Sequence, residues 1–160
     1  MIKEFSIKDI SNILHVINDA SLKYKGVIPD NCWQEPYMSE QELINEFSNG
    51  VRMFGYKKNK KLVGVMGIQE LKKVTLIRHS YTLKKYQGQG IGQKLLHYLF
   101  NINKNSSLLV GTWSDAIWAI DFYKKFGFQL HTRAKTVNLL KKYWNIPVKQ
   151  IDNSVVLEKN

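Results

Sequence analysis

Three glycines at alternate positions, Gly88, Gly90 and Gly92, lie directly ahead of an amphipathic segment, Gln93 to Phe100. Glycine adopts positive φ angles easily and has no Cβ, so a ligand can approach its backbone closely. The first amides of a helix lack intrahelical partners and carry the positive end of the helix dipole. The loop and the helix start together predict an anion site, most simply for phosphate. A flexible turn that only leads into a helix is the structural alternative.

The spacing of these residues excludes two common phosphate-binding motifs. A dinucleotide fingerprint, G-x-G-x-x-G, that began at Gly88 would need glycine at position 93, where the chain has Gln93. The Gly-Lys-Ser or Gly-Lys-Thr of a P-loop occurs nowhere in the chain. What remains is Q-x-x-G-x-G, formed by Gln87, Gly90 and Gly92. It resembles the signature Q/R-x-x-G-x-G/A of the GNAT superfamily, the acyl-CoA-dependent N-acetyltransferases, whose loop amides hold the pyrophosphate of coenzyme A.

The resemblance implies that acetyl-CoA (coenzyme A) is the cofactor and that the residues binding it surround this loop. In the family, backbone N–H groups of a splayed strand also stabilise the oxyanion that develops during acyl transfer, which here points to Tyr81 to Leu83. The cofactor-binding residues are therefore expected to be Tyr81, Thr82, Leu83, Gln87, Gly88, Gln89, Gly90, Ile91, Gly92 and Gln93.

A second segment supports the same resemblance. Residues 119–128 read A-x-x-F-Y-x-K-x-G-F, which is similar to a helix that follows a strand end in the GNAT family. The family's tyrosine at the position of Tyr123 acts as general acid toward the leaving thiolate; a core tyrosine with a satisfied hydroxyl is the structural alternative. Ala116 stands where the family often has an asparagine that contacts the pantetheine arm, so its effect on cofactor affinity is left open.

The implied reaction is attack of a neutral amine on the acetyl thioester. A primary amine has a pKa of ~10 and is mostly protonated at neutral pH, so a group must accept its proton. His79, on the strand ahead of the loop, is the first candidate for the catalytic base because an unperturbed imidazole titrates near neutral pH. Glu70, at the end of the preceding strand, is the second. A structural, hydrogen-bonding histidine is the alternative for His79.

Two aromatic segments outside these motifs are candidates for the acceptor pocket. Residues 31–38 lie between the first two expected helices, where relatives keep acceptor-binding loops, and Trp144 ends a helix ahead of the last strand. Glu35 or Glu70 is expected to favour a cationic amine. Aromatic residues also fill cores, which is the alternative. The predicted substrate-binding residues are Trp33, Glu35, Tyr37, Glu70 and Trp144.

Hydrophobic spacing and turn residues predict the elements that position these side chains. Helices are expected over residues 9–22, 39–49, 92–102, 115–127 and 134–144, and strands over 52–56, 62–70, 74–83, 108–113, 128–132 and 154–158, with 2–5 as an additional first strand. Strand, glycine loop, helix and strand form a crossover unit, which places strands 74–83 and 108–113 parallel in one sheet. We predict a single domain over residues 1–160 with an α/β (α+β) fold, in which helices flank a mixed, mostly antiparallel sheet of six to seven strands.

Composition narrows the class of protein. The formal net charge is +11, but the lysines form short pairs and triplets rather than a basic arm. No apolar run approaches the roughly 18 residues of a membrane span, and the N-terminus lacks the apolar region of a signal peptide. Cys32 is the only cysteine, and no spacing of histidines with carboxylates or Cys32 suggests a metal site.

We therefore expect a cytoplasmic N-acetyltransferase that transfers an acetyl group from acetyl-CoA to a primary amine by direct attack in a ternary complex. The acceptor is a small-molecule or peptide amine, whose identity the sequence leaves open. Neither a membrane nor a nucleic acid is an expected partner, and a homodimer stays open. The alternative is a non-catalytic module that binds or senses acyl-CoA and associates with nucleic acid through its charge.

Overall fold

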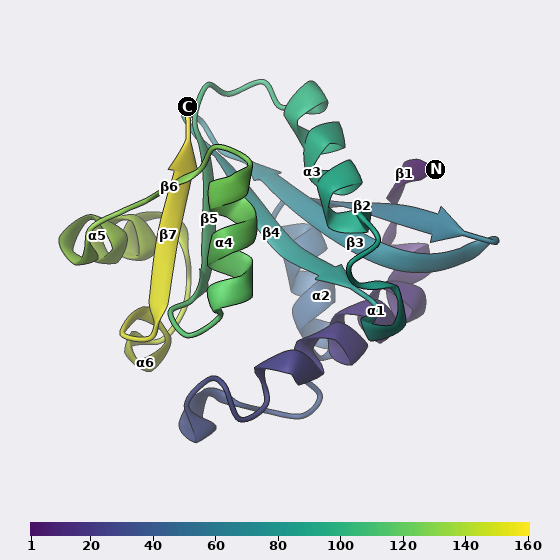
Figure 1. Ribbon diagram of the computed structural model, residues 1–160, viewed down its shortest axis with the longest axis horizontal. Coiled ribbons are helices and arrows are strands. Elements are labelled where there is room, and N and C mark those ends of the chain that lie inside the picture. Colours follow the sequence, from purple (N-terminus) through teal and green to yellow (C-terminus); the bar gives the residue numbers. More distant parts are fainter.

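A seven-stranded mixed sheet forms the centre of the computed structural model, which describes residues 1–160 (Figure 1). The strands lie in the order β1-β2-β3-β4-β5-β7-β6, and every neighbouring pair is antiparallel except β4 and β5, which are parallel. The strands are β1 (Ile2–Phe5), β2 (Val51–Lys58), β3 (Lys61–Glu70), β4 (Thr75–Thr82), β5 (Leu108–Trp113), β6 (Gln129–Leu130) and β7 (Ser154–Lys159). This sheet confirms the predicted fold class, including its parallel pair.

Six helices accompany the sheet, and Figure 1 shows α3 and α4 on its near side and α2 on its far side. In the largest buried cluster, Ile17 of α1, Leu43 of α2 and Leu95 of α3 meet side chains of β2, β3 and β4. Leu140 of α5 and Ile151 of α6 belong to a second, smaller cluster. None of the helices is both long and apolar enough to cross a membrane. The helices are α1 (Ile10–Ala20), α2 (Glu40–Ser48), α3 (Ile91–Ile102), α4 (Ile117–Lys125), α5 (Arg133–Tyr143) and α6 (Val148–Ile151).

Strands β4 and β5 are paired over only part of their length. Residues 75–77 of β4 face residues 108–110 of β5, and the pairing ends there. Beyond that point β4 pairs only with β3, and β5 only with β7. The sheet is therefore open between the two strands at the end of β4 that leads into the glycine loop. We call this opening the β4–β5 gap.

Strand β4 carries a β-bulge beside the gap. Arg78 pairs with Gly67 of β3, but the next paired residue of β4 is Tyr81, so His79 and Ser80 both lie opposite a single residue of β3. His79 has a φ of +54°, in the left-handed region that non-glycine residues seldom occupy. Bulges change the direction of side chains next to functional sites, and here they do so for His79 and Ser80.

The predicted boundaries lie within two residues of those in the structure, and one α-helix was not predicted. Helix α4 begins at Ile117 because Ser114 is held in a turn, where its N–H donates to the Asn153 carbonyl at 2.7 Å. Strand β6 has only two residues because the chain turns early and the Thr132 side chain caps α5. Helix α6, which follows Pro147, has four residues and is too short to produce a periodic signal.

Candidate active site

Two cavities meet at the β4–β5 gap. The first, of about 670 Å³, is walled by β4, β5, the glycine loop, the start of α3, and α4. The second, of about 800 Å³, is walled by α2, β4, β5, α5 and the segment that leads into α6. We call them the α4-side cavity and the α2-side cavity. Because both reach the gap, ligands bound in the two cavities can touch there. The residues lining both are Tyr24, Ile77, His79, Tyr81, Gly111 and Thr112.

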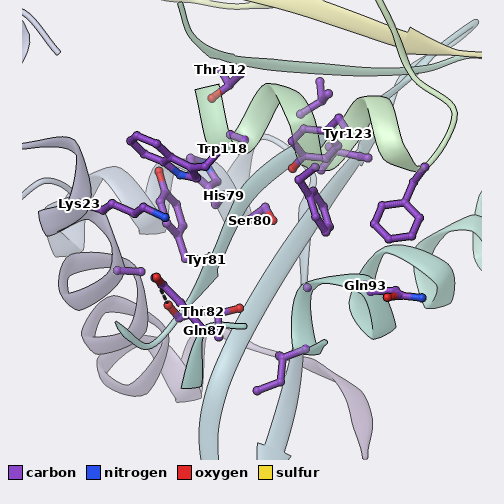
Figure 2. Close-up of a pocket in the computed structure, with 18 of the residues that line it drawn as sticks. Lys23, His79, Ser80, Tyr81, Thr82, Gln87, Gln93, Thr112, Trp118 and Tyr123 are labelled. Atoms are coloured by element: carbon purple, nitrogen blue, oxygen red, sulfur yellow. Dashed lines mark hydrogen bonds between the residues drawn. The ribbon is translucent and has the colours of Figure 1, made fainter. Parts of the chain in front are cut away.

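The glycine loop ahead of α3 forms one wall of the α4-side cavity. Gly88 and Gly90 have φ angles of +76° and +79°, and no atom lies within 4 Å of the place a Cβ would take at either residue. The backbone N–H groups from Gly88 to Gln93 donate to no other backbone group. The Gln87 side-chain amide donates to the Thr82 carbonyl at 3.0 Å and ties the loop to the end of β4 (Figure 2). This open row of amides at a helix start fits the pyrophosphate of coenzyme A.

Most of the predicted cofactor-binding residues line the α4-side cavity, but Leu83 and Gln89 do not. Leu83 is buried, and its N–H donates to the Val63 carbonyl at 2.8 Å, so this amide cannot stabilise an oxyanion. The Gln89 side chain instead accepts a hydrogen bond from Lys58 Nζ at 2.9 Å. The predicted residues that do line the cavity are Tyr81, Thr82, Gln87, Gly88, Gly90, Ile91, Gly92 and Gln93.

Tyr123 lies on α4 and reaches the α4-side cavity, although only 4% of its surface is exposed (Figure 2). Its ring meets Phe122 and Phe128 edge-on, with centroids 5.1 and 5.3 Å away. Burial raises the pKa of the Tyr123 phenol to about 12, while the side chain of Ser80 opposes this rise. The phenol is therefore neutral at physiological pH and is a proton donor.

His79, the other bulge residue, reaches both cavities. Its Nε2 lies 2.6 Å from Oε2 of Glu46 on α2, and the two side chains are 15% and 20% exposed. Arg78 Nη2 lies 3.0 Å from the same carboxylate oxygen. Burial by itself would raise the pKa of the Glu46 carboxyl, but the hydrogen bond with His79 and the charges of His79 and Arg78 hold it below its usual value. Glu46 is therefore ionised at neutral pH.

The α2-side cavity contains two of the residues predicted to bind the acceptor. The Tyr37 hydroxyl accepts a hydrogen bond from Trp113 Nε1 at 2.9 Å, which fixes the ring in the wall. Trp144 lies over Gly111 of β5, with its indole 3.4 Å from the place a Cβ would take there. The missing side chain of Gly111 thus lets Trp144 approach the edge of the gap.

Trp33 and Glu35 do not line either cavity. Trp33 packs against Tyr37, with ring centroids 5.7 Å apart, and its Nε1 donates to Glu35 Oε1 at 3.2 Å. The Glu35 carboxylate is exposed and forms an ion pair with Lys25 at 3.0 Å, which lowers its pKa. Trp33 therefore supports a pocket residue, and Glu35 is neutralised at the surface. The sequence of this irregular segment does not indicate which side chains face inward.

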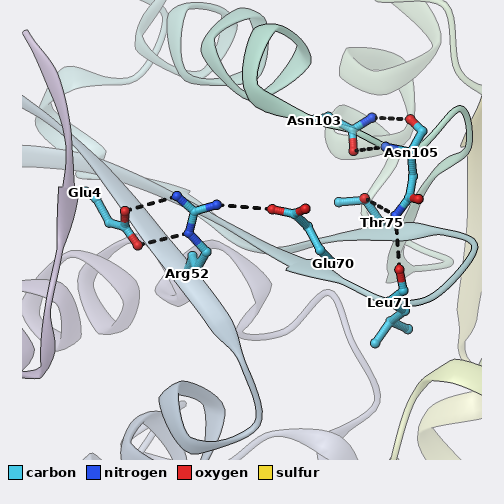
Figure 3. Close-up of polar contacts among 7 residues, drawn as sticks. All are labelled: Glu4, Arg52, Glu70, Leu71, Thr75, Asn103 and Asn105. Carbon is cyan, nitrogen blue, oxygen red and sulfur yellow. Dashed lines mark hydrogen bonds and ion pairs between the residues drawn. The ribbon is translucent and has the colours of Figure 1, made fainter.

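Glu70 is at the opposite end of β4 from the gap, where it pairs with Thr75. Figure 3 shows its carboxylate bound to Arg52, at 3.1 Å, and the same guanidinium bound to Glu4. At this closed end the Asn105 side chain donates to Thr75 Oγ1 at 3.0 Å. Glu70 is not positioned to accept a proton or to bind an amine beside His79, because its partner Thr75 and His79 are four residues apart on an extended strand, roughly 13 Å, and its carboxylate is bound to Arg52.

A family model described as an acetyltransferase (GNAT) domain matches residues 18–141, which include the bulge, the glycine loop and Tyr123. The chain belongs to the GNAT family. The resemblance seen in the two sequence motifs is thereby confirmed, and so is its implication of an acyl-CoA-dependent acetyltransferase domain with acetyl-CoA as the family's acyl donor.

Solved structures of GNAT proteins share this fold over nearly the whole chain. The PaiA N-acetyltransferase of Thermoplasma acidophilum, solved in complex with coenzyme A, matches with a TM-score of 0.74 and 19% identity, covering 100% of this chain and 98% of the other. A GNAT acetyltransferase of Staphylococcus aureus Mu50 gives 0.73 and 18%, covering 100% and 98%. The ribosomal-protein-S18-alanine N-acetyltransferase of Escherichia coli gives 0.72 and 17%, covering 99% and 92%. At these identities the likeness establishes the fold.

One position of the GNAT motif is apolar in this chain. Ala116 is fully buried and forms a small cluster with Ile28 and Trp113. It offers no polar side chain where the family often has an asparagine. Two residues further along, Trp118 lines the α4-side cavity and stacks on Tyr24, with ring centroids 5.7 Å apart. This side of the α4-side cavity is therefore lined by the aromatic rings of Tyr24 and Trp118 and has no asparagine side chain.

Sequence reasoning missed several residues of this site, among them Tyr24 and Trp118 of the aromatic wall and three charged residues. Glu46 and Arg78 belong to the α2-side cavity, and Lys23 lies in the wall of the α4-side cavity, with its Nζ 4.5 Å from the ring of Trp118 (Figure 2). Arg78 could have been found, because it neighbours His79 on a strand already assigned to the site. Nothing in the sequence around Glu46 shows that α2 crosses the strand at this level.

Proposed function

We propose that this chain is an N-acetyltransferase that transfers an acetyl group from acetyl-CoA to a primary amine by direct attack in a ternary complex. The observation that carries the proposal is the meeting of two cavities at the β4–β5 gap. A module that only bound acyl-CoA would need the α4-side cavity alone. The second cavity gives room for an acceptor, and His79 lies where the two meet.

The amides from Gly88 to Gln93 would hold the pyrophosphate, because they have no backbone partner and the surroundings of Gly88 and Gly90 are open. The aromatic wall made by Tyr24 and Trp118 suits the less polar arm of the cofactor. Acetyl-CoA bound here supplies an activated acetyl thioester. The proposal assigns no other cofactor to the site.

Two side chains then handle the protons of the reaction. The amine nitrogen forms a bond to the acetyl carbon as the bond from that carbon to sulfur breaks. His79 accepts the proton that the amine loses, and the neutral phenol of Tyr123 donates one to the departing sulfur. The bulge supports this division of roles, because His79 contacts Glu46 on the α2 side and also lines, with Tyr123, the α4-side cavity.

The charges of the α2-side cavity favour an acceptor with one amine on an otherwise neutral, polar body. Glu46 is already matched by Arg78 and His79, which leaves Glu42 as the cavity's carboxylate without a cationic partner. A polyamine would lose hydration at several ammonium groups without gaining matching anions. The rest of the polar lining suits amide or hydroxyl groups, since it includes Gln34, Asn45, Asn49, Gln69, Asn145 and Gln150.

The test is release of free coenzyme A from acetyl-CoA in the presence of matched amines. An amino sugar such as glucosamine and an alanine dipeptide amide represent the neutral-bodied class, and spermidine represents the polycations. We expect turnover with at least one of the first two and a lower kcat/KM for spermidine. If calorimetry detects acetyl-CoA binding but no amine releases coenzyme A, the acyl-CoA-sensing alternative replaces the enzyme.

A further inference from the structure

Helix α2 places the Glu46 carboxylate beside His79 at the β4–β5 gap, although the two residues are far apart in the sequence. The helix begins at the Ser39 cap, where the hydroxyl accepts from the Glu42 N–H at 3.1 Å, and Leu43 anchors it in the core with no exposed surface. Glu46 follows Leu43 by three residues and so lies on nearly the same face of the helix. Its carboxylate reaches His79 Nε2 at 2.6 Å, across a sequence separation of 33 residues.

The protonation state of this pair follows from the chemistry of its members. An ionised carboxylate has no proton to donate and only accepts hydrogen bonds. Glu46 is held in the ionised form by His79 and Arg78, so the hydrogen atom in the 2.6 Å contact belongs to His79 Nε2. In the neutral form, which is the form that can act as a base, the imidazole carries this one ring proton, and the lone pair is on Nδ1.

We propose that Glu46 is the positioning residue of the acetyl-transfer site, which fixes His79 in the Nε2–H tautomer so that Nδ1 accepts the amine proton. This inference rests on the proposed function. When Nδ1 takes the proton, the positive charge of the ring forms beside the Glu46 carboxylate rather than in an apolar wall. The nitrogen–hydrogen bond of the amine breaks, its electron pair stays on nitrogen, and no further reactant is needed.

A chain of contacts fixes the carboxylate itself. Arg78 Nη2 binds Glu46 Oε2 at 3.0 Å, and Arg78 Nη1 donates to Gln69 Oε1 at 3.0 Å. These side chains line the α2-side cavity, which connects His79 to the wall where the acceptor would lie. The competing explanation is that Glu46 and Arg78 only attach α2 to the sheet. That explanation predicts a loss of stability and no specific effect on the ring of His79.

The first measurement records the ring nitrogens of His79 by ¹⁵N NMR in protein with labelled histidines, without any substrate. His79→Gln identifies the signal among the histidines of the chain. We expect the Nε2–H tautomer in the wild-type protein and loss of this preference in Glu46→Gln and Glu46→Ala. Glu42→Gln is the matched control, because Glu42 lies on the same helix and lines the same cavity but does not contact His79. It should leave the His79 signal unchanged.

The second measurement is steady-state kinetics on the same variants with the best acceptor. For Glu46→Gln we expect kcat to fall about 10- to 100-fold, because His79 remains but is no longer held in the right tautomer and only part of its contribution as general base is lost. The KM for acetyl-CoA should change by less than about twofold. Glu46→Gln keeps the shape of the side chain, so a folded variant is available if Glu46→Ala does not fold.

The outcomes separate this inference from the proposed function. An Nδ1–H tautomer in the wild-type protein, or an unchanged tautomer in Glu46→Gln and Glu46→Ala, overturns the positioning role even if the enzyme is active. A changed tautomer with unchanged kcat overturns the assignment of Nδ1 as proton acceptor. If the wild-type protein acetylates no amine, the proposed function itself is lost.

Discussion

The two sides of the β4–β5 gap are built in different ways. The α4-side cavity is formed mainly by two stretches of chain, from the bulge through the glycine loop to α3 and from β5 to the end of α4. The α2-side cavity takes its walls from α2, the segment before it, three strands, α5 and the segment before α6. The first side depends on local backbone conformation. The second depends on tertiary packing and on the ion pairs around Glu46.

This difference predicts which substitutions affect which substrate. Changes in the α4-side wall should alter acetyl-CoA binding or departure of the thiolate, whatever the acceptor is. Changes in the α2-side wall should alter acceptor KM and leave acetyl-CoA affinity as it is.

The largest effect is expected for Gly90→Val. A branched side chain at φ +79° is strained by roughly 1–2 kcal/mol and occupies the space in front of the loop amides, so the Kd for acetyl-CoA should rise at least about 100-fold. Calorimetry measures it. Gly26→Val is the matched control, because Gly26 has a φ of +80°, equally open surroundings and no place in either cavity. If both variants bind acetyl-CoA like the wild type, the loop is not the pyrophosphate site.

Tyr123→Phe should have the next largest effect. Removing the neutral phenol takes away the proton donor for the leaving thiolate, so kcat should fall about 100-fold while the Kd for acetyl-CoA stays within about twofold. Steady-state assays of coenzyme A release measure kcat, and calorimetry measures the Kd for acetyl-CoA. Tyr98→Phe, on α3 and outside both cavities, should retain wild-type kcat. Equal kcat in wild type and Tyr123→Phe would remove this tyrosine from the mechanism.

Trp144→Ala tests the other side of the gap. The indole lies against Gly111, so its removal widens the α2-side cavity, and the KM of the acceptor should rise about tenfold, equivalent to one lost aromatic contact. The affinity for acetyl-CoA should not change. A parallel loss of acetyl-CoA binding would show that the two sides are not independent.

Acid should weaken the α2 side before the α4 side. The folded-state pKa of Glu46 is depressed, so the ion pair stabilises the protein above the unfolded value of about 4.3 and this contribution is lost as pH falls through the lower folded value. At pH 7, Glu46→Gln should therefore reduce the free energy of unfolding by about 1 kcal/mol. Urea denaturation should show this difference shrinking below pH ~4. A difference that is constant with pH would mean that charge is not what holds α2.

Glu35→Gln should have the smallest effect. The carboxylate is exposed, outside the cavities and paired with Lys25, and exposed ion pairs contribute little. The acceptor KM should change by less than about twofold. A larger increase in acceptor KM would mean that Glu35 contributes to acceptor binding although it lies outside the α2-side cavity.

The same division explains what the sequence could predict. The order of elements, the parallel pair and the glycine loop follow from hydrophobic spacing and from glycines at fixed offsets, which are local signals. Tyr123 and most of the loop residues, which line the α4-side cavity, could be proposed from the sequence because they lie in contiguous motifs. Ala116 was recognised as a departure for the same reason, and the structure shows it buried.

The acceptor side could be predicted only in part. Tyr37 and Trp144 were proposed only because they are aromatic. The same criterion also selected Trp33, which packs against Tyr37 and does not line the cavity. Glu35 and Glu70 were selected for their charge, but their partners, Lys25 and Arg52, come from other parts of the chain. Glu46 was missed because its contact with His79 depends on where α2 lies against the sheet.

The opening through the sheet also bears on inhibition. Because the two cavities meet where β4 and β5 separate, one molecule that occupied both would pass through an opening lined by His79, Tyr81 and Thr112. A coenzyme A thioether joined by a short linker to the acceptor amine has that shape. Each half would raise the effective concentration of the other at its own cavity, so its affinity would exceed that of either part, and lengthening the linker would reduce it.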